Sequence, residues 1–99
     1  MEESDVIAAL SALAQDSRLR VFRLLVTAGP SGLPAGQIAE ELAITPNTLS
    51  FHLSLLKNAG LVTARREGRS LIYSADYGRA KAVIAYLTEN CCARTPCCG

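Results

Sequence analysis

Apolar residues recur at helical spacing through the first third of the chain. Val6, Leu10 and Leu13 lie on one stripe and predict a helix over residues 6–14. A second stripe between Leu19 and Val26 alternates with arginines and predicts another helix, with Asp16 and Ser17 as the break and cap before it. The Gly-Pro-Ser-Gly cluster at residues 29–32 cannot stay helical, so the second helix ends there.

The middle of the chain predicts two short helices joined by a tight turn. Pro34 suits a first helical residue, and the apolar positions that follow it mark a helix to Leu42. Thr45 and Pro46 form the clearest start signal in the chain, a hydroxyl N-cap followed by proline at the first helical position. This helix is expected to run to Ala59, with Gly60 in the left-handed position after it.

The remaining pattern predicts a hairpin and a last helix. Residues 61–66 and 70–75 are predicted to be strands, joined by a Glu-Gly-Arg turn at residues 67–69. Asp76 can cap a helix from Tyr77 to about Asn90. The order helix, helix, helix, helix, hairpin, helix predicts a mainly α winged helix-turn-helix (ααααββα). Residues 1–90 would form its DNA-binding and dimerisation domain, and residues 91–99 a cysteine-rich tail.

Charge is distributed unevenly along the chain. The net charge of +1 by itself says nothing about nucleic acid, but residues 57–81 carry six bases against two acids, a local charge of +4. Phosphates respond to such local charge, because screening limits the reach of distant charges. The acidic N-terminus contains no apolar signal segment, and no apolar run is long enough for a membrane helix. We therefore expect a cytoplasmic protein with reduced thiols and no membrane contact.

The helix that begins at Pro46 has two different faces. Leu49, Leu53 and Leu56 share the face that must be core, and the opposite face lacks acids and presents small groups suited to a major groove about 12 Å wide. Phe51 could contact a thymine methyl or pack on a neighbouring helix. His52 lies at the edge of the apolar face, where a hydrogen-bonded, semi-buried role is favoured over base contact. The candidate DNA contacts in and before this helix are Thr45, Pro46, Asn47, Thr48, Ser50, Phe51, His52 and Ser54.

The predicted hairpin carries basic residues on or beside its tip. Arg65, Arg66 and Arg69 could contact phosphate or enter a minor groove, or they could simply solvate a turn. A basic hairpin directly after a recognition-type helix favours the DNA interpretation. The predicted partner is therefore double-stranded operator DNA.

All four cysteines lie in the last nine residues, as two adjacent pairs. Packing does not explain pairs on a polar tail. Zinc is possible but less favoured, because tetrahedral sites usually space their ligands two to four residues apart. Trivalent arsenic or antimony needs only three thiolates, which Cys91, Cys92 and either Cys97 or Cys98 could supply. A thiol-redox sensor remains an alternative. An enzyme with a cysteine nucleophile does not fit, because neither a base nor an anion-binding loop flanks the thiols.

Several segments together resemble the ArsR/SmtB family of arsenic-responsive repressors. The resemblance covers residues 5–92 and rests on the runs Asp16 to Phe22, Thr48 to Leu53, Ala59 to Val62 and Arg66 to Arg69. It implies a homodimeric repressor that metal or metalloid binding releases from its operator, with the Ser-x-His-Leu motif on the recognition helix. It also implies a dimer formed by the first and last helices, for which the candidates are Ile7, Leu10, Leu13, Val83, Ile84 and Leu87.

The resemblance also bears on the inducer. Well-known members carry a Cys-x-Cys box at the start of the third helix, but residues 33–38 contain no cysteine. The tail is similar to that of a subgroup with Asn-Cys-Cys and a further cysteine after the last helix, which binds As(III). This similarity implies Cys91, Cys92 and Cys98 as ligands, while Cys97 departs from the pattern and leaves the third ligand open. We expect one ion per subunit: As(III), or else Sb(III) or a methylated trivalent arsenical, with Zn or Cd as the alternative.

Overall fold

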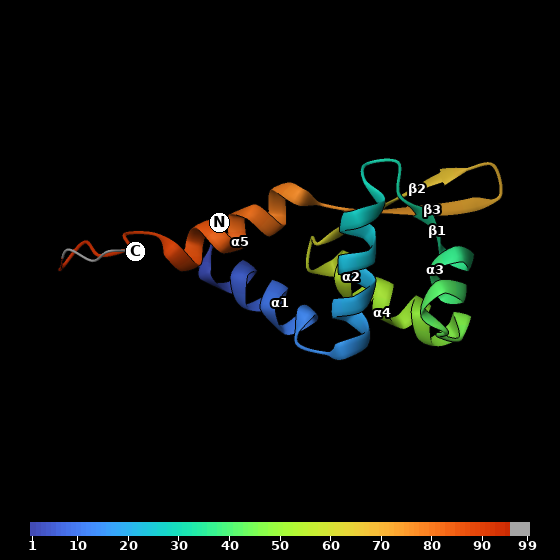
Figure 1. The fold of residues 1–99 in the computed structure, drawn as a ribbon, viewed down its shortest axis with the longest axis horizontal. Helices are drawn as coiled ribbons and strands as arrows, with labels where there is room; N and C mark the ends of the chain where they lie inside the picture. The colour runs from blue at the N-terminus through green and yellow to red at the C-terminus, as the bar shows by residue number, and fades with distance from the viewer. Residues whose placement is uncertain (96–99) are drawn as a thin grey trace.

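The computed structural model describes residues 1–95 and contains five α-helices and three strands among them (Figure 1). The predicted order of helices and hairpin is confirmed, and one short strand is added to it. In chain order the elements are α1 (Glu3–Leu13), α2 (Asp16–Ala28), β1 (Leu33–Pro34), α3 (Ala35–Leu42), α4 (Pro46–Asn58), β2 (Val62–Glu67), β3 (Ser70–Ala75) and α5 (Tyr77–Thr88).

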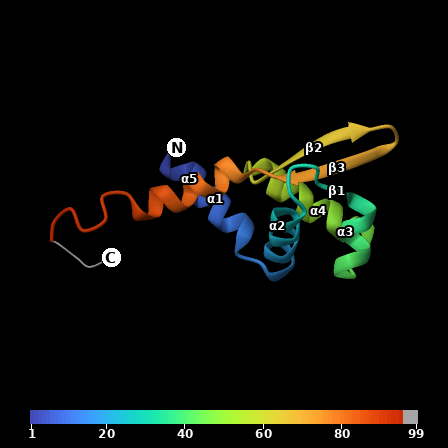
Figure 2. The same cartoon turned by 45° about the horizontal axis from the view of Figure 1, so that its top comes forward.

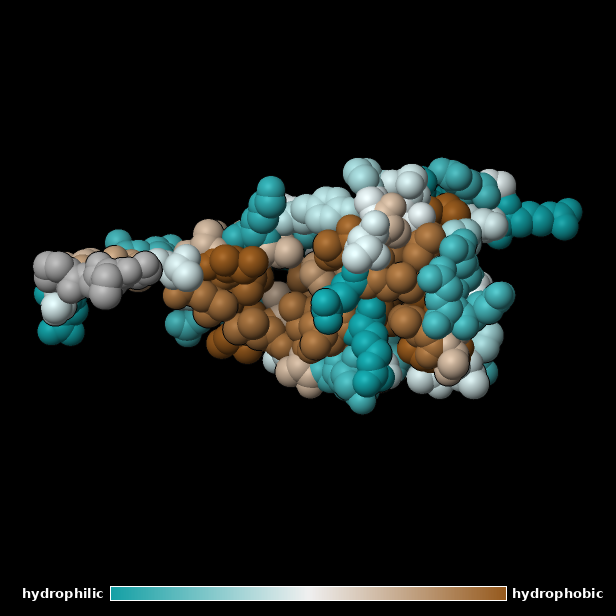
Figure 3. All heavy atoms as spheres, in the orientation of Figure 1, coloured by the Kyte–Doolittle hydropathy of each residue, from teal (hydrophilic) through white to brown (hydrophobic). Residues whose placement is uncertain are grey.

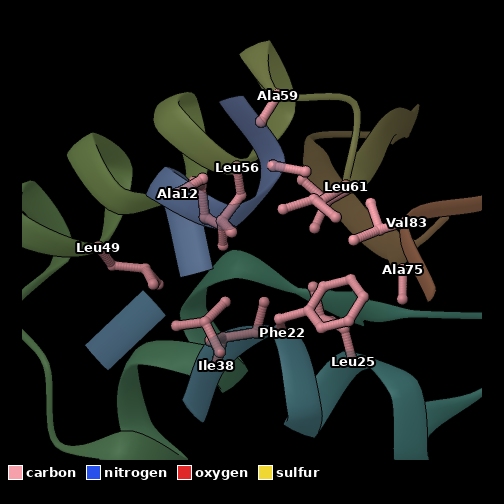
Figure 4. Close-up of a cluster of buried hydrophobic side chains, with 14 of the residues drawn as sticks. Ala12, Phe22, Leu25, Ile38, Leu49, Leu56, Ala59, Leu61, Ala75 and Val83 are labelled. Atoms are coloured by element: carbon pink, nitrogen blue, oxygen red, sulfur yellow. The ribbon is translucent and has the colours of Figure 1, made fainter. Parts of the chain in front are cut away.

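The hydrophobic core is built around α2, α3 and α4 (Figure 4). Leu25 from α2, Ile38 from α3 and Leu56 from α4 are completely buried, and Leu61 closes the core beside the sheet. Aliphatic side chains dominate this core, as expected for a chain without tryptophan. Burial of each such side chain contributes about 1.5–3 kcal/mol, so packing on one apolar face holds α4 in place.

The sheet is a hairpin extended by one very short strand. Its order is β1-β3-β2, with all pairs antiparallel and Leu33 opposite Tyr73. The sequence pattern does not reveal β1, because its two residues are too few to show alternation and its partner lies about forty residues further on. Gly32, just before β1, has a φ of 71°, and a Cβ there would collide with the carbonyl oxygen of Tyr73. The close approach of the two backbones therefore requires glycine at this position.

The helix ends agree with several sequence signals and correct others. Pro46 is the first residue of α4, Gly60 has a φ of 77°, and the Asp76 side chain accepts from the backbone N–H of Arg79 at 2.9 Å. Pro34, in contrast, precedes α3 as its N-cap. Gln15 caps α2 in place of Asp16 and Ser17, because its side chain accepts from the backbone N–H of Arg18 at 2.8 Å.

The first and last helices lie side by side at one end of the molecule, and the β2–β3 hairpin projects from the other end (Figures 1 and 2). The start of α5 also contacts the short segment that links α4 to β2. The Asp76 backbone N–H donates to the carbonyl oxygen of Leu61 at 2.8 Å, and the Arg79 guanidinium lies against Gly60. Within residues 1–95, no helix combines the length and apolar character needed to cross a membrane.

Candidate nucleic-acid interface

The structure separates α4 into a buried face and an exposed face, as the sequence predicts. Leu49, Leu53 and Leu56 are buried in the core. The opposite side chains are exposed, and Phe51 retains 60% of its surface in contact with solvent. The helix contains neither aspartate nor glutamate, so nothing on this face repels phosphate. The exposed candidates from the sequence on this helix are Asn47, Thr48, Ser50, Phe51 and Ser54.

The start of α4 is open to an anion. Thr45 is the N-cap residue, but its hydroxyl donates to the hydroxyl of Thr48 at 2.9 Å and makes no hydrogen bond to a backbone N–H. The first N–H groups of a helix have no partner within the helix, and the helix dipole favours negative charge beside them. Thr45 and Pro46 are both exposed, so a DNA phosphate can approach this end of α4.

His52 differs from the other candidates, because it is buried. Its exposed fraction is 7%, and its Nδ1 lies 3.3 Å from a terminal guanidinium nitrogen of Arg18. This is the hydrogen-bonded, semi-buried role that the sequence analysis favoured over base contact. His52 is therefore removed from the candidate DNA contacts, because burial keeps its ring away from a base edge.

The three arginines of the hairpin do not share one environment. All three side chains are exposed, and Arg66 and Arg69 border a shallow groove next to the start of α3. Arg65 makes several contacts within the protein: its guanidinium donates to the Ser31 carbonyl oxygen at 2.6 Å, to the Ser74 hydroxyl at 3.3 Å and to Glu67 at 2.7 Å. Arg65 thus holds the loop after α2 against the hairpin, and the phosphate candidates in the hairpin narrow to Arg66 and Arg69.

Apolar side chains are exposed over α1 and α5, where Figure 3 shows a brown surface. Ile7 and Leu10 from α1 are exposed, as are Ile84 and Leu87 from α5, with Ile84 at 62%. Two other predicted interface residues are placed differently. Val83 is 5% exposed within the core of the subunit, and Leu13 is partly buried against that core.

The first cysteine pair follows α5 in a turn. The helix ends at Thr88, within two residues of the predicted end, where its C-cap Glu89 has an extended ψ of 134°. Asn90 and Cys92 then have positive φ angles of 59° and 61°. The sulfur atoms of Cys91 and Cys92 lie 3.4 Å apart, closer than adjacent positions on a helix would place them. Cys92 is disulfide-bonded, which differs from the expectation of reduced thiols.

The remaining predicted ligands, Cys97 and Cys98, lie outside the described residues. Among residues 1–95, no group of three or more histidine, cysteine, aspartate or glutamate side chains is arranged to hold a metal ion. The described part of the chain therefore contains two of the predicted thiol ligands and no competing metal site.

Three residues position these elements through contacts that the sequence pattern does not predict. Arg18 reaches His52 from α2, Ser74 accepts from Arg65 while donating to the Pro30 carbonyl oxygen at 3.1 Å, and Arg79 covers Gly60. Only Arg18 belongs to a motif that the sequence analysis had singled out, the run from Asp16 to Phe22. Each partnership joins distant segments, and no local pattern encodes it.

Two short helices in the helix-turn-helix arrangement, followed by a basic antiparallel hairpin, define a winged helix-turn-helix DNA-binding protein. A family described as "Helix-turn-helix domain" matches residues 13–65. The transcriptional activator HlyU of Vibrio cholerae is 30% identical over 83 residues, which are 84% of this chain and 74% of that protein.

Two further relatives are regulators whose full length exceeds the matched region. The regulator NmtR of Mycobacterium tuberculosis is 39% identical over 72% of this chain and 57% of its own length. A Staphylococcus aureus homolog of the cadmium resistance regulatory protein CadC is 32% identical over 81% of this chain and 64% of its own length. This chain thus spans roughly three fifths of each of these two proteins.

Solved structures share the fold. A homodimeric winged helix-turn-helix domain from Mycobacterium bovis, described as a possible ArsR-family regulator, has a TM-score of 0.72 and 29% identity, covering 88% of this chain and 81% of that one. A possible transcriptional regulator for arsenical resistance has a TM-score of 0.67 and 28% identity, covering 87% and 90%. The chain belongs to the ArsR/SmtB family of winged helix-turn-helix transcriptional regulators, whose members are DNA-binding proteins and not enzymes.

Proposed function

We propose that this chain is a homodimeric repressor that leaves its operator when trivalent arsenic or antimony is bound by thiolates of the tail. The observation that carries the inducer assignment is the close pair of cysteines directly after α5. Their sulfur atoms are 3.4 Å apart in an exposed turn, where no hydrophobic packing accounts for them. Thiol protons are lost as such an ion binds, so the reduced tail is the binding form.

The ligand requirement favours a pyramidal ion over tetrahedral zinc. Tetrahedral zinc takes four ligands, which are usually spaced two to four residues apart, whereas the tail offers adjacent pairs. A three-coordinate thiophilic ion needs only three thiolates. Among the predicted ligands, Cys98 is favoured over Cys97 as the third thiolate because of the family resemblance. Zinc or cadmium remains the alternative inducer, and one relative is named for cadmium resistance and another for arsenical resistance.

The proposed dimer uses the exposed apolar face of α1 and α5. Ile7, Leu10, Ile84 and Leu87 lie in this face, and burying them against a second copy would remove a large apolar surface from water. The Mycobacterium bovis relative described as homodimeric supports a dimer. Two copies of α4 would then enter successive major grooves about 34–36 Å apart.

Release would pass through α5. The tail follows this helix directly, and the start of the same helix contacts the segment that follows α4: Asp76, its N-cap, bonds Leu61, and Arg79 lies against Gly60. A change in how α5 packs would thus alter both the dimer face and the support of the recognition helix. A coupling of about 1–3 kcal/mol, typical of allosteric proteins, would weaken DNA binding roughly 5- to 150-fold.

Arsenite titration of a DNA complex tests the inducer assignment. The probe is a duplex selected by the wild-type protein from a randomised pool, and release is followed with As(III), Sb(III), Zn(II) and Cd(II). We expect Cys91→Ser and Cys92→Ser to bind the duplex normally and to resist arsenite. The matched pair Cys97→Ser and Cys98→Ser identifies the third ligand, with Cys98→Ser expected to lose the response. Normal release from the Cys91→Ser, Cys92→Ser double variant would place the site elsewhere.

A thiol-redox regulator is the second candidate, and the disulfide at Cys92 favours it. In this case oxidation of the tail, and not ion binding, would change how α5 packs. Peroxide should then release the duplex in the presence of a metal chelator, and a thiol reductant should restore binding. If peroxide leaves the chelated complex intact while arsenite dissociates it, the redox candidate is excluded.

A further inference from the structure

A buried polar contact lies directly behind the exposed face of α4. His52 is the buried side chain that follows Phe51, and the two rings have their centroids 5.8 Å apart at a tilt of 57°. The contact from His52 to Arg18 spans 34 positions in the chain and joins α2 to α4. A buried polar group without a partner is costly, so this contact resists separation of the two helices.

The chemistry of arginine determines the role of the histidine in this hydrogen bond. A guanidinium can only donate, so Nδ1 of His52 is the acceptor in this contact. If a hydrogen-bond donor stood in place of Nδ1, neither that donor nor the Arg18 guanidinium would have an acceptor in this contact.

Arg18 also contacts the end of α1. Its Nε donates to the carbonyl oxygen of Ala12 at 2.7 Å, and its backbone N–H donates to the side-chain oxygen of Gln15, the N-cap of α2, at 2.8 Å. Within residues 1–95, no carboxylate lies within 4 Å of this guanidinium. Arg18 thus donates to acceptors from α1 and α4 while its backbone lies in the first turn of α2, and it joins three helices at one point.

We propose that Arg18 is a positioning residue for DNA recognition, which sets the placement of α4 and of Phe51 through His52. Its side chain would make no phosphate contact itself. This inference rests on α4 being the helix that reads DNA, and it is independent of the inducer. Loss of Arg18 would lower binding to the selected duplex more than binding to random duplex, because positioning affects base readout more than phosphate attraction.

The experiment measures Kd for the selected duplex and for a random duplex, each over a range of salt, with full-length protein below its thermal midpoint. Arg18→Met removes the donors but keeps the apolar stem, and His52→Leu removes the acceptor. His52→Asn keeps an acceptor oxygen near the position of Nδ1. Arg20→Met is the matched control, since Arg20 is an exposed arginine of the same helix that only pairs with Asp16 at 3.8 Å.

We expect Arg18→Met and His52→Leu each to weaken selected-duplex binding about tenfold, as for loss of a charged hydrogen bond. The double variant should be no weaker than either single one, and His52→Asn should bind like wild type. The salt slope should not change, whereas a lost phosphate contact would lower it by about 0.9. Wild-type binding by Arg18→Met, additive losses, or a reduced salt slope would each overturn the proposal.

Two measurements keep the proposal separate from its premise. Asn47→Ala and Ser50→Ala remove exposed groups of α4 and should reduce preference for the selected duplex. If the preference for the selected duplex is unchanged in these variants, α4 does not read the DNA, and both the premise and the positioning role of Arg18 are refuted. If these variants do reduce the preference and Arg18→Met behaves as wild type, only the role of Arg18 is refuted.

Discussion

Arg65 and Arg69 are four positions apart and carry the same charge, but their surroundings give them different roles. Arg69 is exposed at the hairpin turn. Arg65 donates to a carbonyl oxygen and a hydroxyl of segments that lie far from it in the chain. Arg69 can change its position to meet a phosphate, while Arg65 would have to break internal hydrogen bonds to do so.

Alanine substitutions of these two arginines should therefore have opposite signatures. Arg69→Ala should lower the salt slope of DNA binding by about 0.9 for each subunit while leaving stability within about 0.5 kcal/mol. Arg65→Ala should lower the free energy of unfolding by about 1–2 kcal/mol, mainly through Ser31 and Ser74, because its exposed pair with Glu67 contributes little. Urea denaturation and salt-dependent binding check both. A reduced slope with unchanged stability in Arg65→Ala would restore Arg65 as a phosphate contact.

Ala43 is a site of local backbone cost in the turn of the helix-turn-helix. It ends α3 with a left-handed φ of 53°, while the next N–H donates to the Ala39 carbonyl oxygen at 3.0 Å. This conformation disfavours any residue with a Cβ. We expect Ala43→Gly to raise the unfolding free energy by about 0.5–1 kcal/mol, and thermal unfolding measures it. Ala82→Gly within α5 is the control and should lower stability by about 1 kcal/mol.

At the scale of elements, local signals predicted the helices well and the contacts between elements poorly. Pro46 and Asp76 placed the starts of α4 and α5 correctly, because a first-turn proline and a capping carboxylate act on adjacent residues, although the Thr45 hydroxyl makes no capping hydrogen bond. The two residues of β1 could not be predicted, since their only support is pairing with β3. The sequence favoured a semi-buried His52 but could not identify its partner, and it did not predict the internal contacts of Arg65. In both cases the partner lies 34 positions away.

A charge placed in the exposed apolar face of α1 and α5 should break the proposed dimer. Ile84→Asp should convert the proposed dimer to monomer, because a charge in an apolar interface is costly to bury. Sedimentation equilibrium would report the change, and circular dichroism would show that the helices persist. Leu71→Asp, at an exposed apolar position in β3 away from this face, is the control. A dimer that survives both Ile84→Asp and Leu87→Asp would require a different interface.

In the molecule as a whole, the two ends present different surfaces. The hairpin presents basic groups and the exposed face of α4 presents small polar groups around Phe51. The helices α1 and α5 present apolar surface instead (Figure 3). A dimer joined through α1 and α5 would hold its two DNA-reading surfaces at a fixed separation. This geometry predicts that spacing within the DNA site matters as much as its sequence.

Insertion of five base pairs at the centre of the selected duplex should weaken binding at least about tenfold. Five base pairs turn one half-site to the opposite face of the double helix, and a rigid dimer then reaches only one of them. Gel shift or anisotropy titration measures the loss. The same insertion in a random duplex should have no effect and provides the control. Equal affinity for both spacings of the selected site would mean that the subunits bind DNA independently.

Residues 89–95, which follow α5, lie at the opposite end of the molecule from the hairpin (Figure 1). For the proposed sensor, this separation affects the timing of gene expression. An inducer that competed with DNA for one surface would have to wait until the repressor left its operator. Here the tail stays accessible while the repressor occupies its operator, so the inducer can act on the bound complex. The delay before transcription then follows the arrival of the inducer and not the lifetime of the undisturbed complex.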